Sequence, residues 1–239
     1  MDKYYTLFLL FMLYSIFGWL VEVTGKIVIE HKWMNRGFLI GPYCPIYGFG
    51  GLFITLLLDK YKNNVLILFF MSIIICSILE YLTSYFMEKI FKTRWWDYSR
   101  YKFNINGRIC LETMVVFGIL GCLGVLVLNP FFRHLISYIP STVLPVVSFV
   151  ICFIFIFDFI VSTSIIFSFR NTIRNVEKDA TEEITKKVRN VFLHKDFLHR
   201  RLIKAYPNMK SRKERLIEIR NRVNRELERL ELYYKRKKK

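Results

Sequence analysis

The sequence lacks the signatures of several common enzyme classes. It contains no phosphate-binding loop of the form Gly-x-x-x-x-Gly-Lys-Ser/Thr, so the chain is not expected to hydrolyse ATP itself. Its five cysteines include no Cys-x-x-Cys pair, which argues against a disulfide framework and a zinc site. The four histidines are scattered, and the closest two, His194 and His199, are five residues apart, a poor spacing for ligands on one helix face. These absences favour a protein without catalytic activity of its own, and no cofactor is indicated.

Long apolar stretches dominate what is present. Of the 239 residues, 54% are hydrophobic and 17% aromatic, which is high for a soluble protein. A membrane-spanning helix needs about 20 mostly apolar residues. Five stretches qualify, at about 5–25, 39–58, 65–87, 109–128 and 142–169. The sequence therefore predicts an all-α integral membrane protein with five transmembrane helices.

Two of these stretches need comment. The first could be taken for a signal peptide, but its apolar run is long and no Ala-x-Ala-like site follows it, so we expect a retained span. The second begins with Gly41-Pro42 and Pro45 and continues through several glycines. Proline and glycine interrupt regular helix, so this stretch is expected to be a broken or partly re-entrant helix.

The distribution of basic residues predicts the orientation. Lys and Arg are retained on the cytoplasmic side of a membrane. With the N-terminus outside and the C-terminus inside, the inner loops carry nine Lys and Arg, and the outer segments carry four. Residues 170–239 add 23 basic and 10 acidic residues. We therefore expect a five-span membrane domain over residues 1–169, oriented N-out/C-in, and a basic cytoplasmic tail over residues 170–239.

The tail shows apolar residues every three or four positions on each side of Tyr206-Pro207-Asn208. This periodicity predicts two amphipathic helices, and Ser211 with Glu214 forms the capping-box pattern that starts the second. A helical hairpin is the expected product. Its basic faces suit anionic lipids, although simple positive-inside anchoring explains the same charge. Nucleic-acid binding is not expected, because no recognised module is present.

Four acidic residues fall within the expected spans: Glu22, Glu80, Glu112 and Asp158. Charges in a bilayer are costly and usually face a partner or a cavity. The expected topology places the first three at a similar depth near the cytoplasmic side, with Asp158 deeper. Arg108 precedes Glu112 by four residues, which predicts an ion pair on one helix face. The alternative is that the acids only fix the packing of the helices.

The two inner loops carry further polar and aromatic residues. Asn35 and Arg36 lie in the first, and Trp95, Trp96, Asp97 and Asn106 lie in the third. An aromatic belt at the headgroup layer would explain the tryptophans, but it requires neither the adjacent aspartate nor the run to Arg108. We therefore expect both loops to fold toward the membrane. The hypothetical polar site comprises Glu22, Asn35, Arg36, Glu80, Trp95, Trp96, Asp97, Asn106, Arg108 and Glu112.

Six short motifs occur in order along the chain: Gly18-Trp19-Leu20-Val21-Glu22, Asn35-Arg36-Gly37-Phe38-Leu39, Pro45-Ile46-Tyr47-Gly48, Leu79-Glu80-Tyr81, Trp95-Trp96-Asp97-Tyr98 and Asn106-Gly107-Arg108-Ile109-Cys110. With this set, residues 5–130 resemble the ABC-transporter permease family called type IV or CmpB-like. The resemblance implies a multi-pass protein of the bacterial inner membrane. It implies no catalytic residues.

Two classes of function follow. The first is the membrane subunit of a transporter, which would need a separate ATPase subunit or a second copy of the chain because five spans are few for a complete pathway. The second is an intramembrane protein or enzyme that binds a lipid headgroup with the interfacial acids and tryptophans. A structural scaffold is the third alternative.

Overall fold

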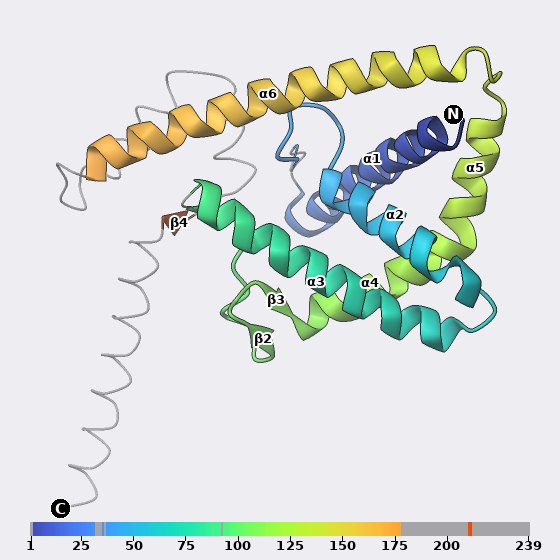
Figure 1. Ribbon diagram of the computed structural model, residues 1–239. Helices are drawn as coiled ribbons and strands as arrows, with labels where there is room; N and C mark the ends of the chain where they lie inside the picture. The colour runs from blue at the N-terminus through green and yellow to red at the C-terminus, as the bar shows by residue number, and fades with distance from the viewer. Residues whose placement is uncertain (1, 32–34, 36, 92, 178–209, 212–239) are drawn as a thin grey trace, which may run out of the picture.

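The computed structural model describes residues 2–31, 35, 37–91, 93–177 and 210–211, which form a mostly helical fold (Figure 1). The helices are α1 (Asp2–Glu30), α2 (Pro45–Leu58), α3 (Val65–Phe91), α4 (Leu111–Leu123), α5 (Asn129–Ser137) and α6 (Leu144–Glu177), with a 3-10 turn η1 (Asp59–Tyr61) and a π-helical segment η2 (Gly124–Leu128). Four two-residue strands form two antiparallel pairs, β1 (Thr93–Arg94) with β4 (Lys210–Ser211) and β2 (Asn104–Ile105) with β3 (Ile109–Cys110).

Four helical stretches are long and apolar enough to cross a membrane: Asp2–Val28, Val65–Phe91, Leu111–Ser137 and Leu144–Phe167. Each has 24 to 27 residues, which at about 1.5 Å per residue exceeds a hydrocarbon core of about 30 Å. The membrane class of the protein is thus confirmed. The described residues contain four such helices rather than the five expected, because the second stretch forms only the 14 residues of α2, about 21 Å of helix.

The segment before α2 explains why this helix is short. Pro45 takes the first helical position, where its missing N–H costs nothing. Residues 37–44 are not helical, yet Leu39 is completely buried and the backbone N–H of Cys44 donates to the Ser15 carbonyl over 2.8 Å. The segment therefore packs inside the helical bundle, and α2 continues from it.

Glycines allow α1 and α2 to pack closely. A Cβ atom added to Gly18 would collide with the ring of Tyr47, and one added to Gly51 would collide with the ring of Tyr14. Because Tyr47 lies opposite the later part of α1 and Gly51 lies opposite an earlier part, the two helices run antiparallel. Their close approach fixes Tyr47 beside Gly18 and Glu22 of α1.

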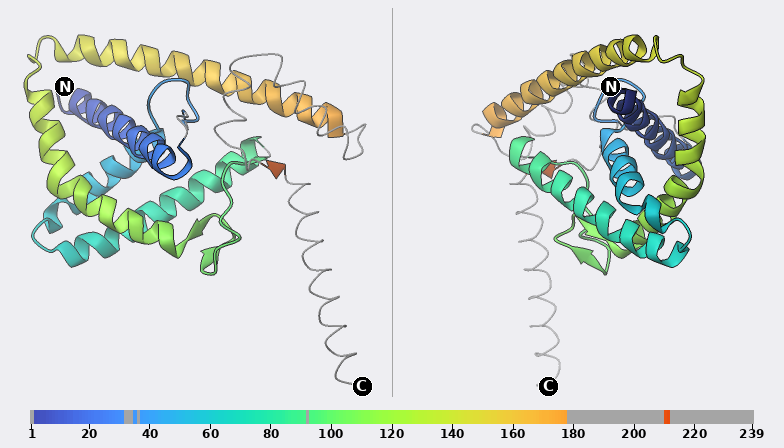
Figure 2. Two further views of the ribbon diagram at one scale, coloured as in Figure 1. Left: turned by 180° about the vertical axis from the view of Figure 1, so that it is seen from behind. Right: turned by 45° about the vertical axis from the view of Figure 1, so that its right-hand side comes forward.

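The other helices complete the bundle around this pair. The α3 and α4 helices lie side by side and antiparallel, with Gly118 against the Phe69 ring. The π-helical segment η2 precedes Pro130, and the helical axis changes direction there, so that α5 turns away from α4 (Figure 2). The α6 helix runs along α1 in the same direction, with ring contacts between Tyr5 and Phe149 and between Phe11 and Phe155.

The α6 helix is longer than its apolar part. The stretch long and apolar enough to cross a membrane is Leu144–Phe167, and the helix continues as far as Glu177. The expected tail hairpin lies outside the described residues, apart from the end of α6 and strand β4, which pairs with β1.

Candidate functional site

Glu22 and Glu80, two of the acids of the expected polar site, line one cavity between α1, α2, α3 and α4. The cavity has a volume of about 230 Å³. The hydroxyl of Tyr47 donates a hydrogen bond to Oε1 of Glu22 over 2.7 Å. The hydroxyl of Tyr98 is hydrogen-bonded to the Glu80 carboxylate. Each acid of the cavity is thus oriented by a tyrosine from a different segment.

Tyr98 lies in the loop between β1 and β2, outside the membrane-spanning helices. Burial raises the pKa of its hydroxyl above the ordinary value, and the nearby carboxylates of Glu80 and Glu22 raise it further, because a buried phenolate next to an acid is unfavourable. The hydroxyl therefore keeps its proton and serves as the donor to Glu80.

The rest of the cavity wall is mainly apolar and aromatic. The lining includes Tyr14, Phe17, Ile46, Ile54, Leu79, Trp96, Phe117, Leu120 and Leu128, together with Gly50, Gly51, Gly121 and Gly124. Glu22 follows Tyr14 by eight residues on α1, a rise of about 12 Å along the helix. The cavity therefore has an acidic end near Glu22 and a mainly apolar end near Tyr14, where the Tyr14 hydroxyl donates to the Gly124 carbonyl at 3.2 Å.

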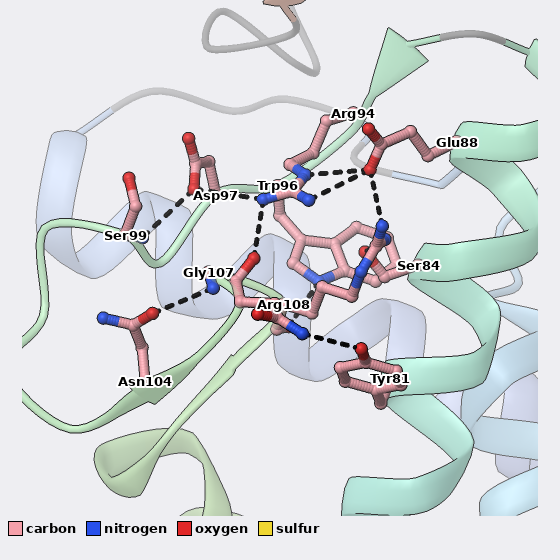
Figure 3. A network of polar contacts seen from close by, with 11 residues as sticks. Tyr81, Ser84, Glu88, Arg94, Trp96, Asp97, Ser99, Asn104, Gly107 and Arg108 are labelled. Carbon is pink, nitrogen blue, oxygen red and sulfur yellow. Dashed lines mark hydrogen bonds and ion pairs between the residues drawn. The ribbon is translucent and has the colours of Figure 1, made fainter. Parts of the chain in front are cut away.

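A second polar cluster lies beside the cavity and is centred on Glu88 of α3 (Figure 3). Oε2 of Glu88 accepts hydrogen bonds from Nε and Nη2 of Arg94 at 3.1 and 3.0 Å and from Nη2 of Arg108 at 2.8 Å. The side chains of Arg94 and Arg108 are only 6% and 10% exposed. Two buried guanidinium groups thus share one carboxylate, and Asp97 supplies a second negative charge at 3.6 Å from Nη1 of Arg94.

The cluster ties the end of α3 to the β2–β3 hairpin (Figure 3). Nη1 of Arg94 donates to the Asn106 carbonyl at 2.9 Å, Nη1 of Arg108 donates to Ser84 Oγ at 3.1 Å, and Nδ2 of Asn106 donates to the Tyr81 hydroxyl at 2.9 Å. Predicted residues Asn106 and Arg108 are therefore together, with Asp97 beside them, although their partners on α3 were not among the expected residues.

The Asn106-Gly107 pair makes the hairpin turn. Both residues have positive φ angles, 53° and 66°, and the N–H of Arg108 donates to the Ile105 carbonyl at 2.9 Å, which is the geometry of a type I′ turn. A Cβ atom on Gly107 would lie 2.6 Å from Oδ1 of Asp97. The turn thus requires glycine, and it aims Arg108 at α3.

The two tryptophans take different positions. Trp96 lines the cavity, and its Nε1 donates to the Arg108 carbonyl at 3.1 Å, so it connects the cavity to the Glu88 cluster. Trp95 is 4% exposed and packs with Phe91 and Ile166. Trp95 is therefore part of the apolar core between α3 and α6 rather than of the cavity.

The expected ion pair between Arg108 and Glu112 is wrong. The α4 helix begins at Leu111, so Arg108 precedes it and the four-residue spacing does not place the two side chains on one helix face. Arg108 pairs with Glu88 instead, and Glu112 is exposed at the start of α4, outside the cavity lining.

Asn35 orders the loop after α1. Its Oδ1 accepts hydrogen bonds from Trp19 Nε1 at 2.7 Å and from the Gly37 N–H at 3.0 Å, and its Nδ2 donates to the Ile40 carbonyl at 2.9 Å. Asn35 therefore shapes the segment that leads to α2 and is not part of the cavity lining. Arg36, also among the expected site residues, lies outside the described residues.

Asp158 has a separate role from the other three acids. Its carboxylate accepts hydrogen bonds from the N–H groups of Ile40 and Gly41 at 3.0 and 2.7 Å, from the Tyr43 hydroxyl at 2.6 Å and from Ser162 Oγ at 2.8 Å. Non-helical backbone at membrane depth must find such partners within the protein. Asp158 thus holds the irregular segment before α2 in place.

Sequence reasoning missed Glu88, Tyr47 and Tyr98. Glu88 fell just beyond the expected end of the third span, where an acid needs no explanation. The tyrosines did lie within the motifs Pro45-Ile46-Tyr47-Gly48 and Trp95-Trp96-Asp97-Tyr98, so the signal was present. Only the fold shows that each of them meets an acid. Among the described residues, no group of three or more His, Cys, Asp and Glu side chains is placed to hold a metal ion.

Comparison with known families agrees with the motifs. The model of one family, described as putative ABC-transporter type IV, matches residues 9–163, which is more than half of the 239 residues. The matched range contains all the described residues of the cavity lining and of the Glu88 cluster. Searches of curated proteins and of solved structures found no match.

Proposed function

The chain belongs to the putative ABC-transporter type IV family, and from this premise we propose that it is the membrane subunit of a transporter with its solute site in the cavity between α1 and α4. The observation that carries the proposal is the cavity itself, which places Glu22 and Glu80 against an otherwise apolar wall. A concave, mainly apolar site with a few converging polar groups is the usual form of a small-molecule site.

An ATPase on a separate subunit would supply the energy, because the sequence contains no phosphate-binding loop of its own. We propose no catalytic activity for this chain. The Glu88 cluster is well placed to transmit motion, since Arg94 and Arg108 join the loop between α3 and α4 to the end of α3 and Trp96 joins this cluster to the cavity.

The proposal includes an arrangement in the bacterial inner membrane with the N-terminus outside and the C-terminus in the cytoplasm. Residues 37–58 would make the second crossing as a non-helical segment followed by α2, so that five crossings remain although only four helices have full length. The antiparallel packing of α2 on α1 supports this path. The basic tail would then face the anionic lipids of the cytoplasmic leaflet, and a second copy of the chain could complete the pathway.

An intramembrane lipid-headgroup-binding protein or enzyme is the second candidate, and the apolar wall of the cavity favours it. A phosphate group, however, would meet the carboxylates of Glu22 and Glu80. The buried arginines of the neighbouring cluster, Arg94 and Arg108, are already engaged by Glu88. The geometry therefore supports the transporter subunit better.

Affinity purification of the full-length chain from its native membranes, followed by mass spectrometry of proteins and lipids, tests the proposal. We expect an ATPase with a phosphate-binding loop to be recovered in comparable molar amount. An unrelated multi-pass protein with the same tag is the control. Recovery of one phospholipid species in fixed amount and of no ATPase would favour the second candidate and contradict the first.

A further inference from the structure

Glu80 is a buried acid without a counter-charge in the described part of the chain. Glu80 is 8% exposed, and its carboxylate is hydrogen-bonded to the Tyr98 hydroxyl. The ion pairs that join Glu88, Arg94, Asp97 and Arg108 do not include Glu80. A buried carboxylate is unfavourable unless it is paired with a cation or protonated. The carboxylate therefore needs either a proton or a neighbouring positive charge, and a bound cation would supply the second.

The cavity next to Glu80 supplies the space for such a charge. Trp96 and Tyr98 lie in the wall of the same cavity, with Tyr98 hydrogen-bonded to Glu80, and aromatic faces attract organic cations. None of the described lining residues is Lys or Arg. From this end, the wall continues along Leu79 and Phe117 toward Gly124, where an added Cβ atom would have open space beyond the backbone of its own helix.

We infer that the cavity binds an organic cation that carries a short apolar chain, with the cationic head against Glu80 and the chain directed toward Gly124. The inference rests on the proposed function for its role, since the bound molecule would be the transported solute. A volume of about 230 Å³ lies below the range of about 300–1,000 Å³ for drug-sized ligands, so the chain is short. A bare metal ion is a poorer fit, because it would leave the apolar end empty.

Binding of hexyltrimethylammonium tests the inference directly. The full-length protein in lipid nanodiscs is dialysed to equilibrium against the radiolabelled compound, with empty nanodiscs as background. Hexanoate and hexanol have the same chain with a negative and a neutral head. We expect the cation to bind at least about tenfold more tightly than either, because only the cation gains the charge interaction with Glu80. Equal binding of the cation and hexanol would overturn the inference.

Glu80→Gln removes the charge and keeps an oxygen that can accept from Tyr98. It should weaken binding of the cation by about tenfold or more and leave hexanol unchanged. Glu112→Gln is the matched control, since Glu112 is an exposed acid outside the cavity. Unchanged cation binding in Glu80→Gln would show that Glu80 does not hold the cationic head, and would refute the assignment.

A second variant tests where the apolar chain of the cation binds. It also tests the inference if Glu80→Gln does not fold. Gly124→Leu would fill the apolar end of the cavity, so that fewer CH₂ groups of the hexyl chain could be buried. We therefore expect the binding of hexyltrimethylammonium to weaken about tenfold and the binding of tetramethylammonium, which has no such chain, to stay unchanged. Gly25→Leu is the control, since Gly25 is equally open but lies outside the lining. An equal loss for both compounds, or none for either, would contradict the proposed direction of the chain.

Failure of this inference can be told apart from failure of the proposed function. If an ATPase copurifies with the chain but the cation does not bind, the transporter assignment stands and the solute class is wrong. If the cation binds and no ATPase is found, the site is correct and the transport role is not.

Discussion

Replacing Asp158 with alanine should destabilise the protein strongly, because this side chain replaces the hydrogen bonds that a regular helix would have made in the segment before α2. The carboxylate accepts from the backbone N–H groups of Ile40 and Gly41 and from two hydroxyls. The residue is 8% exposed, so water cannot replace it freely.

The expected loss follows from the two backbone donors. A buried donor left without an acceptor costs about 1–3 kcal/mol, so the two N–H groups together cost about 2–6 kcal/mol. The hydroxyls add less, because Ser162 on α6 can turn toward a backbone carbonyl of the preceding turn. We therefore expect the free energy of unfolding of Asp158→Ala to fall by about 2–6 kcal/mol.

Equilibrium unfolding of the purified protein in mixed micelles, with increasing denaturing detergent, measures this change. Ser162→Ala removes one of the four donors to Asp158 and should cost only about 1 kcal/mol. Ser164→Ala on the exposed side of α6, where the hydroxyl bonds only to the Ile160 carbonyl, should have almost no effect. A loss for Asp158→Ala no larger than that for Ser162→Ala would refute the reasoning that the carboxylate holds the segment.

Three further outcomes are expected. Glu88→Ala should lower the free energy of unfolding by about 3–5 kcal/mol, because it removes the carboxylate that the buried Arg108 guanidinium is paired with and leaves the buried Arg94 with only the longer contact to Asp97, whereas Lys89→Ala on the exposed face should be nearly neutral in the same detergent titration. Gly107→Ala should cost about 1–2 kcal/mol for its positive φ angle, measured by thermal unfolding; an unchanged midpoint would contradict the turn geometry. In a variant without native cysteines, a cysteine at Lys60 should react with an impermeant reagent from outside and one at Arg100 only after the membrane is opened. Labelling of Arg100 in intact cells would reverse the topology.

The sequence predicted the long helices well, because burial in lipid imposes a simple rule. The third span was expected over residues 65–87 and forms Val65–Phe91, since an unbroken apolar run without proline has no alternative in a bilayer. The second stretch was correctly expected to be irregular from Gly41, Pro42 and Pro45. Its hydropathy alone could not reveal that it yields only 14 helical residues, because the non-helical part is equally apolar.

The candidate site was predicted in part, and the errors have a common physical cause. Glu22 and Glu80 could be placed together from the sequence, because the depth of a residue along a membrane-spanning helix can be counted from the sequence, and the two residues line the same cavity. The partner of Arg108 could not be found in this way, since the type I′ turn at Asn106-Gly107 redirects the chain immediately before α4. A spacing rule for helices holds only where the helix has already begun.

The hydrogen-bond partners of the embedded acids separate their roles more sharply than depth does. Asp158 has four donors within 3.0 Å, and Glu88 has two guanidinium partners, so each is satisfied by groups that also hold the chain in shape. Glu80 is as buried as Asp158, but it is bonded to one tyrosine hydroxyl and faces a cavity. Where the fold itself supplies the hydrogen bonds or the opposite charge that a buried acid needs, the role of the acid is best explained as stabilising the fold. An acid that the fold buries beside open space, with its charge unmatched by the described residues, is better explained by something that enters that space.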